Sequence, residues 1–313
     1  MPGEPMRVAV IGVGHLGRHH ARIVSTLEGV HLQAVVDTVN DRALAAAAAT
    51  GAHALTDYRE LIGQVDAVTI AVPTELHAEI AVPFLDRGTA VLVEKPMSRS
   101  LQDADRMLAA AARSGATFAV GHTERFNPAV AAIMPLVTSP RFIEVHRLSA
   151  FPERSLDIDV VFDLMIHDLD VVLALVRSEV TSIEAVGVPV LTPTFDIANA
   201  RLRFASGCIA NITASRISRD RVRKIRFFQP DSYISIDYAA QEAEGWRLVP
   251  RQGARPEIEG GSIPVTRDEP LRRELDDFVR AVRESRPPMV DGAAGRKALE
   301  LASQIAEKMG GRS

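Results

Sequence analysis

A carboxylate and an imidazole four residues apart form the first pattern in this sequence that could carry out chemistry. Asp163 and His167 lie within Val160–Val176, an apolar stretch with the length of a helix. Residues at i and i+4 share one face of a helix, so the carboxylate can fix the orientation and tautomer of the imidazole and raise its basicity. An ordinary exposed face is the alternative. The apolar neighbours leave little polar surface, however, so we expect these groups, with Asp168 and Asp170, to be buried or to line a cavity.

A lysine after a short apolar run is the second candidate. Lys95 lies in Glu94-Lys95-Pro96, directly after the predicted strand Ala90–Val93. Arginine accounts for 32 of the 36 basic side chains, which leaves 4 lysines. Lysine, unlike arginine, can readily change its protonation state. Lys95 is therefore a candidate for a chemical role.

Three glycines mark a place where a dinucleotide could bind. Gly12-x-Gly14-x-x-Gly17 separates the apolar run Val8–Ile11 from a predicted helix over Arg18–Leu27. In such a loop the first glycine permits a tight turn, the second lets the backbone approach a pyrophosphate, and the third lets helix and strand pack closely. The helix N-terminus offers N–H groups and a partial positive charge to the phosphates.

The residue after the second predicted strand bears on the choice of cofactor. Leu32–Val36 ends in Asp37, which lies 20 residues after Gly17. A carboxylate at about this distance meets the adenosine ribose hydroxyls, so an unrelated glycine-rich turn is the weaker explanation. It also repels a 2′-phosphate, and Arg42 is the nearest cation. The sequence predicts NAD rather than NADP.

Strands alternate with helices over residues 1–121, which predicts an α/β fold with a doubly wound parallel (Rossmann) sheet as the NAD-binding domain. Ligands of such a sheet lie at the carboxyl ends of the strands. The residues at these ends are Gly12, Asp37, Pro73, Glu94 with Lys95, and Gly121 with His122. Beyond those already named, the predicted elements are the strands Ala67–Val72 and Thr117–Val120 and the helices Asp41–Thr50, Asp57–Ile62, His77–Arg87 and Leu101–Ser114.

Residues 122–313 are predicted as a second, α+β domain with a mostly antiparallel open sheet, because most strands follow one another without helices. Arg251–Arg267, rich in Gly, Pro and charge, is predicted as a surface loop. The last helix could pack back on the first domain. The predicted elements are the helices Pro128–Leu136, Val160–Val176, Leu271–Glu284 and Gly292–Met309 and the strands Phe142–Leu148, Val180–Val188, Asp196–Phe204, Cys208–Ser215, Arg221–Phe228 and Ser232–Tyr238.

The composition excludes several classes of protein. The 313 residues are 47% hydrophobic and 24% charged, as in a soluble globular protein, and suffice for two domains. A net charge of −4 gives no reason to expect nucleic acid or a membrane as partner. Cys208 is the only cysteine, no leader or membrane span is apparent, and no metal-ligand spacing occurs. We expect a cytoplasmic protein whose mechanism needs no metal.

These motifs, with Pro73-Thr74-x-x-His77, resemble those of the Gfo/Idh/MocA (glucose-fructose oxidoreductase, inositol dehydrogenase, rhizopine catabolism) family over essentially the whole chain. In that family the equivalents of Lys95, Asp163 and His167 gather beside the nicotinamide and the reacting sugar carbon, which implies that these residues are catalytic. The family's open sheet often forms an oligomer interface, which implies a homo-oligomer, a dimer or a tetramer. The cofactor contacts implied are Gly12, Val13, Gly14, His15, Leu16, Asp37, Pro73, Thr74, His77, Glu94 and Lys95.

Three segments are similar to a group within that family, the bacterial UDP-N-acetylglucosamine 3-dehydrogenases. They are residues 122–128, 157–168 and 228–231. Such enzymes oxidise the sugar-nucleotide 3-hydroxyl before an aminotransferase acts, which implies a small-molecule sugar-nucleotide substrate and a role in amino-sugar or lipid A precursor synthesis. The substrate contacts expected on this basis are His122, Arg125, Asn127, Arg154 and His167.

A basic strip from Arg216 to Arg226 has two interpretations. It holds six cations against one acid, Asp220, and arginine forks suit a diphosphate. Alternating charges also fit a solvated strand face. Arg125 and Arg154 are nearer the predicted site in sequence and are the better candidates for phosphate or sugar contacts. The six cations are Arg216, Arg219, Arg221, Arg223, Lys224 and Arg226.

The predicted reaction is the oxidation of an alcohol with NAD. His167 would accept the hydroxyl proton, Asp163 would orient it, and Lys95 would stabilise the developing alkoxide or relay the proton. Two alternatives stay open: a dehydrogenase of an unphosphorylated sugar or polyol, and a non-catalytic dinucleotide-binding sensor. A sensor would have no need of a proton relay.

Overall fold

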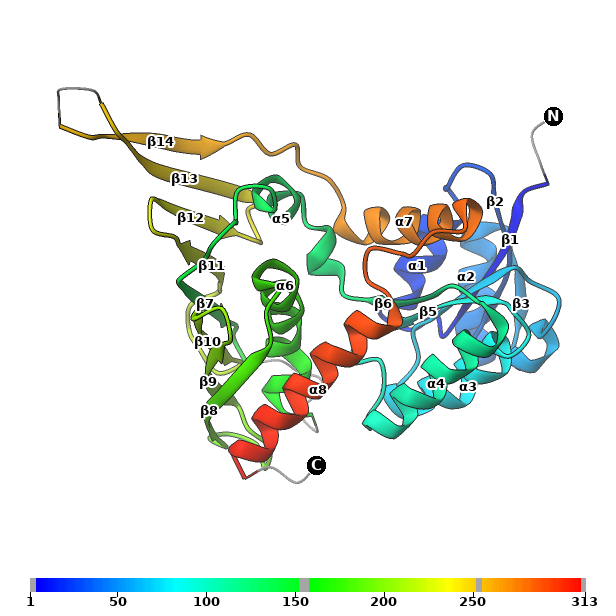
Figure 1. Cartoon of the computed structure of the whole chain (residues 1–313). Helices are drawn as coiled ribbons and strands as arrows, with labels where there is room; N and C mark the ends of the chain where they lie inside the picture. Colours follow the sequence, from blue (N-terminus) through cyan, green and yellow to red (C-terminus); the bar gives the residue numbers. More distant parts are fainter. Residues whose placement is uncertain (1–3, 152–157, 252–254, 311–313) are drawn as a thin grey trace. The chain divides into compact units, whose positions relative to one another are not determined.

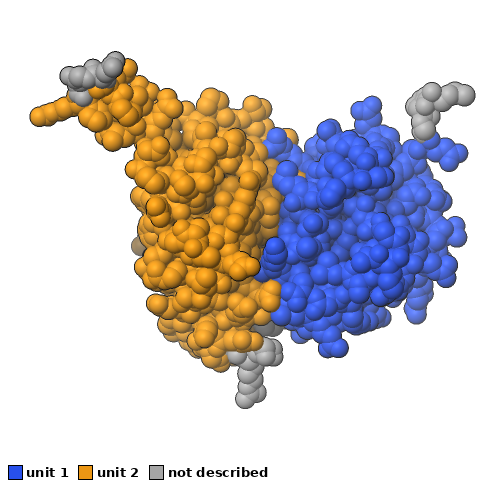
Figure 2. All heavy atoms as spheres, viewed as in Figure 1, with its two compact units in different colours: residues 1–122, 271–297 blue, residues 123–270, 298–313 orange. Residues whose placement is uncertain are grey.

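The chain forms two compact units (Figure 2). The computed structural model describes residues 4–151, 158–251 and 255–310. Unit 1 contains residues 1–122 and 271–297, and unit 2 contains residues 123–270 and 298–313. This division differs from the predicted domains, 1–121 and 122–313, because a segment near the C-terminus joins the N-terminal unit.

Unit 1 is built on a six-stranded parallel sheet in the order β3-β2-β1-β4-β5-β6 (Figure 1). This is the strand order of a doubly wound dinucleotide-binding fold, so the predicted class is confirmed. β3 was not predicted, because three residues at a sheet edge carry too short a pattern. The strands are β1 (Met6–Ile11), β2 (Val30–Val36), β3 (His53–Leu55), β4 (Ala67–Ile70), β5 (Ala90–Glu94) and β6 (Phe118–Gly121).

Helices connect these strands, and one helix returns from the far end of the chain. In α7, Leu275, Phe278 and Val279 share an apolar cluster with Val8 and Val10 of β1, which explains why this segment belongs to unit 1. The helices are α1 (Gly17–Val24), α2 (Asn40–Thr50), α3 (His77–Leu85), α4 (Leu101–Ser114), α7 (Pro270–Glu284) and the first part of α8 (Gly292–Lys308), with 3₁₀ turns at Tyr58–Leu61 and Thr74–Leu76.

Helix α4 occupies the residues predicted for it because the sequence caps both of its ends. The Ser100 hydroxyl accepts a hydrogen bond from the backbone N–H of Asp103 at 3.1 Å. Gly115 follows the last turn with φ +75°, a conformation that favours glycine. Within the described residues, no helix is both long and apolar enough to cross a membrane.

Unit 2 is built on an eight-stranded sheet in the order β14-β13-β12-β11-β7-β10-β9-β8. β7 and β10 run parallel, and the other neighbouring strands run antiparallel, as predicted. The strands are β7 (Phe142–Leu148), β8 (Val180–Val188), β9 (Ile197–Phe204), β10 (Ile209–Ser215), β11 (Val222–Phe228), β12 (Ser232–Asp237), β13 (Glu242–Val249) and β14 (Glu257–Ile263).

One face of this sheet forms the core of unit 2. Ile143, Val145 and Arg147 of β7 are buried, while Glu144 and His146, which alternate with them, are half-buried. The buried face shares an apolar cluster with Leu169 of α6 (Ile166–Val176), and Figure 1 shows α6 alongside β7 and β10. α5 (Pro128–Ile133), a 3₁₀ turn at Thr123–Phe126 and the last part of α8 complete the unit.

The prediction of a surface loop over Arg251–Arg267 was wrong over Glu257–Ile263, which form β14. β13 was not predicted at all. Both strands belong to a hairpin with mostly exposed or half-buried residues, so polar side chains and glycines occupy positions that a covered strand would fill with apolar ones. Their pattern therefore looks like that of a loop.

Candidate active site

Each glycine of the loop in unit 1 is explained by a different feature of its surroundings. Gly12 has φ +84°, and a Cβ on Gly17 would lie 1.7 Å from the carbonyl oxygen of Gly12, so these two glycines allow the turn and the close packing of α1. A Cβ on Gly14 would meet no atom within 4 Å. No acidic residue occupies the first turn of α1. The loop therefore packs without filling the space beside Gly14, as a pyrophosphate site requires.

Asp37 is held at the carboxyl end of β2 by backbone donors. Its side chain is 8% exposed, and the two oxygens accept hydrogen bonds from the N–H groups of Val13 at 3.1 Å and Val39 at 2.9 Å. The nearest guanidinium nitrogen of Arg42 is 3.9 Å away. The carboxylate is thus fixed next to the glycine loop, where the predicted ribose contact requires it.

His77 begins α3 and ties two turns of unit 1 together. Its Nε2 lies 3.0 Å from the carbonyl oxygen of Val72, after β4, and its Nδ1 lies 3.3 Å from that of Met97. Burial lowers the pKa of His77, which favours the neutral ring, while the carbonyl oxygens of Val72 and Met97 act in the opposite direction. His77 therefore faces backbone carbonyls within the unit, beside the predicted cofactor residues Pro73 and Thr74.

Glu94 and Lys95 lie at the carboxyl end of β5. Glu94 is 5% exposed, and its side chain contacts His20 of α1. Lys95 is half-buried, and its peptide bond to Pro96 is cis. His122 follows β6 and is 1% exposed. The structure thus brings the predicted cofactor residues and Lys95 to one edge of the parallel sheet.

The Asp163–His167 segment differs from the predicted helix. Residues Val161–Met165 form a π-helical turn, in which the N–H of Ile166 donates to the carbonyl of Val161, and only then does α6 begin. Apolar periodicity cannot detect such a turn, because it inserts a single residue into the helix. Both Asp163 and His167 are half-buried. π-Helical turns within helices are frequent at functional sites.

The two acids beyond His167 are buried and paired, as expected for charges on an apolar helix. Asp168 accepts two hydrogen bonds from the guanidinium of Arg147, at 2.6 and 3.0 Å. Arg147 also donates to Glu124 at 3.0 Å and lies over the ring of Tyr238. Burial opposes the charge on Arg147, but the two carboxylates outweigh burial and raise its pKa. This network fixes α6 against β7.

Two predicted substrate contacts have partners within unit 2. Arg125 donates to both carboxylate oxygens of Asp170, at 2.9 and 2.7 Å. Asn127 is 2% exposed and caps α5, where it accepts from the N–H of Ala129 at 3.0 Å. Arg154, a third predicted contact, lies outside the described residues.

The basic strip is not one uniform surface. Arg216 is fully buried and donates to Asp196 at 2.9 Å and to the carbonyl of Ile158 at 2.6 Å. Burial opposes ionisation of Asp196, but loop N–H groups, Thr192 and Arg216 outweigh burial and hold the pKa of Asp196 well below its usual range. Neither interpretation of the strip anticipated this structural role for Arg216. The residues around Arg216 in the sequence do not indicate that it pairs with Asp196, twenty residues earlier.

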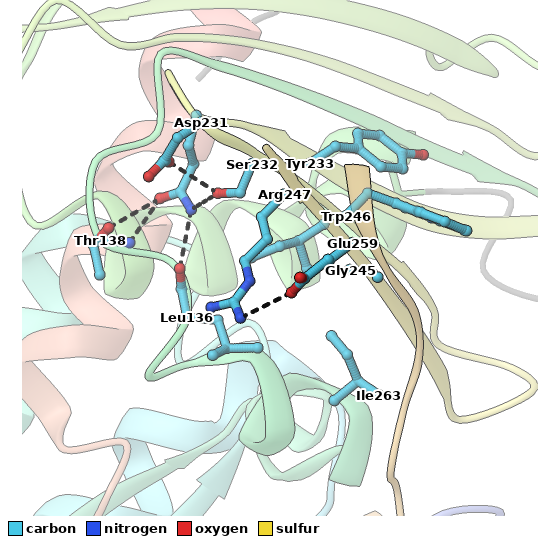
Figure 3. Close-up of a pocket in the computed structure, with 13 residues that line it drawn as sticks. Leu136, Thr138, Asp231, Ser232, Tyr233, Gly245, Trp246, Arg247, Glu259 and Ile263 are labelled. Atoms are coloured by element: carbon cyan, nitrogen blue, oxygen red, sulfur yellow. Dashed lines mark hydrogen bonds and ion pairs between the residues drawn. The ribbon is translucent and has the colours of Figure 1, made fainter. Parts of the chain in front are cut away.

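A pocket with a volume of about 410 Å³ lies in unit 2, among β12, β13 and β14 and the segment after α5 (Figure 3). Arg247 and Glu259 form an ion pair of 3.4 Å in its wall. The Gln229 side chain accepts from the N–H of Thr138 at 2.7 Å. None of the predicted site residues is among the described residues that line this pocket.

The glycine loop, the fixed Asp37 and the lysine at the same sheet edge are the arrangement of a dinucleotide-dependent dehydrogenase. Residues 6–122 match the family described as "Oxidoreductase family, NAD-binding Rossmann fold". Residues 140–229 match the "GFO/IDH/MocA C-terminal domain". The chain belongs to the Gfo/Idh/MocA family of oxidoreductases.

Individual relatives cover nearly the whole chain. The UDP-N-acetylglucosamine 3-dehydrogenase of Acidithiobacillus ferrooxidans is 36% identical over 305 residues, 96% of each protein. A solved structure of that enzyme has a TM-score of 0.90 at 35% identity and 97% coverage of both chains. An inositol 2-dehydrogenase of Rhizobium meliloti is 26% identical over 330 residues, covering 97% of this chain and 98% of that protein. Levoglucosan dehydrogenase, solved with NADH and levoglucosan, shares the fold with a TM-score of 0.88 at 19% identity, covering 98% and 97%.

Proposed function

We propose that this protein oxidises the 3-hydroxyl of UDP-N-acetylglucosamine with NAD. The observation that carries the proposal is the 36% identity with the UDP-N-acetylglucosamine 3-dehydrogenase, which extends over 96% of both proteins. A match of that extent spans both units.

For the cofactor, NAD is proposed over NADP. The ribose hydroxyls would be bound by Asp37, whose orientation is fixed by the N–H groups of Val13 and Val39. The pyrophosphate would lie beside Gly14, where a Cβ would meet no atom within 4 Å. A carboxylate fixed in this way opposes a 2′-phosphate at the same place by charge repulsion.

In the proposed reaction the chain's own residues move the proton. His167 accepts the proton of the substrate hydroxyl, and Asp163 orients the imidazole and stabilises its charged form. Lys95 stabilises the alkoxide that develops on the same oxygen. Held by the glycine loop and Asp37, NAD would supply the acceptor for the hydride of the carbinol carbon. His122 and Arg154 are proposed as substrate contacts.

We further propose a cytoplasmic homo-oligomer, a dimer or a tetramer, formed through the sheet of unit 2. The half-buried and exposed face of this sheet carries large apolar side chains, among them Phe228 and Trp246, which are 36% and 42% exposed. Exposed apolar surface of this kind favours association with another protein surface. Light scattering of the purified protein would give the number of copies.

A second candidate function is the oxidation of an unphosphorylated sugar or polyol. The full-length similarity to an inositol 2-dehydrogenase favours it, although the identity is lower, at 26%. The two candidate functions differ in whether the substrate carries a diphosphate. The sugar nucleotide has this charged group, whereas myo-inositol and N-acetylglucosamine do not.

The test is NAD reduction by the purified protein with UDP-N-acetylglucosamine, N-acetylglucosamine or myo-inositol as substrate. Of the three substrates, we expect only UDP-N-acetylglucosamine to be oxidised. Lys95→Met and His167→Asn should each lower kcat by about 10²–10⁴-fold while NAD binding is retained. Turnover of myo-inositol instead would favour the second candidate. NAD binding without turnover of any alcohol would favour a sensor.

A further inference from the structure

Two buried side chains support the turn that carries Lys95. His20, on α1, is fully buried, and its Nε2 lies 3.0 Å from one carboxylate oxygen of Glu94. The other oxygen of Glu94 accepts the backbone N–H of Lys95 at 3.2 Å. Among the described residues, Nδ1 of His20 has no hydrogen-bond partner, so the contact with Glu94 is the polar anchor of the ring.

The surroundings leave the Glu94 carboxylate little freedom. Glu94 pairs with Gly121 across β5 and β6, and a Cβ on Gly121 would lie 2.9 Å from the carboxyl carbon of Glu94. A side chain at residue 121 would therefore displace the carboxylate. A carboxylate that is 5% exposed requires partners, and His20 and the Lys95 N–H supply them.

The same contact joins two parts of the site. His20 lies three residues after Gly17, on the helix whose N-terminus faces the proposed pyrophosphate position. Because Nε2 faces a carboxylate, it carries the proton and donates. One buried hydrogen bond thus connects the cofactor-binding helix to the strand end that carries Lys95.

We propose that His20 and Glu94 are positioning residues for Lys95, acting through the hydrogen bond from His20 to Glu94 and the bond from the Lys95 N–H to Glu94. This inference rests on the proposed role of Lys95 in the reaction. Neither residue touches the reacting atoms in this account. Because a displacement of about 1 Å can lower a catalytic rate about 100-fold, loss of this support has a measurable consequence.

The test compares His20→Leu with His20→Gln. Glutamine places an amide N–H near the position of Nε2 and can still donate to Glu94, whereas leucine cannot. We expect His20→Leu to lower kcat at least about tenfold with little change in KM, and His20→Gln to recover most of the loss. His31→Leu, a histidine change at an exposed position of β2, is the matched control and should leave kcat unchanged.

A second readout does not depend on turnover. The NAD-saturated protein is treated with limiting acetic anhydride, and the rate of acetylation of Lys95 is measured by mass spectrometry. The acetylation rates of Lys224, Lys297 and Lys308 in the same sample serve as internal references. We expect His20→Leu to change the acetylation rate of Lys95 by at least about threefold, because the position and surroundings of Lys95 change. The acetylation rates of the other three lysines should stay the same. Glu94→Gln, which keeps the size of the side chain, provides the same comparison if His20→Leu does not fold.

The two failures can be told apart. A wild-type protein that does not oxidise UDP-N-acetylglucosamine would overturn the proposed function, while the acetylation rates would still test the support of Lys95. Unchanged acetylation of Lys95 in both His20→Leu and Glu94→Gln would overturn this inference. Equal kcat losses in His20→Leu and His20→Gln would also overturn it, because the hydrogen bond would then not be the property that matters.

Discussion

The two units place their ionisable side chains in different ways. In unit 1, Asp37 and Lys95 lie at the carboxyl ends of parallel strands, and Asp37 contacts the glycine loop. In unit 2, Arg147 and Asp168 meet between a strand and a helix, where both are less than 5% exposed. In the proposed function the first arrangement presents charges to a ligand, whereas the second pairs buried charges with each other.

This difference determines which substitutions affect binding and which affect stability. Replacing Asp37 would remove the proposed cofactor contact and the acceptor of two backbone N–H groups, but it would leave no buried charge without its partner. A buried pair cannot lose one member without leaving a charge in a poorly solvated place. The following experiments test that distinction.

The largest effect is expected from Asp168→Ala. It removes the bidentate partner of Arg147, which is 4% exposed, and breaking a buried pair typically costs about 3–5 kcal/mol. We expect the free energy of unfolding to fall by about that amount in urea, followed by the fluorescence of Trp246. Arg226→Ala is the control, because its pair with Glu144 is about one-third exposed and should contribute less than about 1 kcal/mol. Equal losses would show that burial does not distinguish the two pairs.

The glycine loop offers a matched pair of substitutions. Gly17→Ala would place a Cβ 1.7 Å from the carbonyl oxygen of Gly12, so we expect a loss of stability of at least about 1–3 kcal/mol. Gly14→Ala meets no atom within 4 Å, so its thermal midpoint should stay near that of the wild type. Its Kd for NAD should rise at least about tenfold, because the methyl group takes the space proposed for the pyrophosphate. Wild-type affinity in Gly14→Ala would contradict that placement.

A smaller effect is expected from changing the cofactor preference. Asp37→Ser with Val39→Arg removes the repulsive carboxylate and supplies a cation for a 2′-phosphate. We expect the ratio of kcat/KM for NADP to that for NAD to rise at least about tenfold. The wild type should prefer NAD. If it uses NADP equally well, the interpretation of Asp37 is wrong.

The smallest effect on function is expected at Cys208. Burial raises the pKa of this thiol to about 11, so very little thiolate is present at pH 8. In the native protein we expect its reaction with a disulfide reagent to be at least about 100-fold slower than in urea, and to accelerate as the pH rises. NAD turnover should be unchanged during that exposure. Rapid native labelling would show that the core of unit 2 opens to solvent.

Much of unit 1 could be predicted from the sequence because its signals are local. The glycine spacing, the apolar strand runs and the residues directly after them indicate the sheet and its ligand-binding edge. His20 carries no such local signal, and only the fold shows that it contacts Glu94, 74 residues later.

Unit 2 could be predicted less completely because its interactions connect distant segments. Arg147 and Asp168 are 21 residues apart, and Arg216 and Asp196 are 20 apart, with no motif that links them. The π-helical turn at Val161–Met165 also leaves no periodic signal. The role of such a residue depends on which distant residue it contacts, and the local sequence does not identify that partner.

The proposed reaction requires that a hydride leaves carbon 3 of the sugar. UDP-N-acetylglucosamine deuterated at that carbon would be incubated with NAD and the purified protein, and the reduced cofactor would be analysed by mass spectrometry. The account predicts that the reduced cofactor carries the deuterium and that the sugar product has lost it. Reduced cofactor without deuterium, formed while the sugar keeps its label, would contradict it.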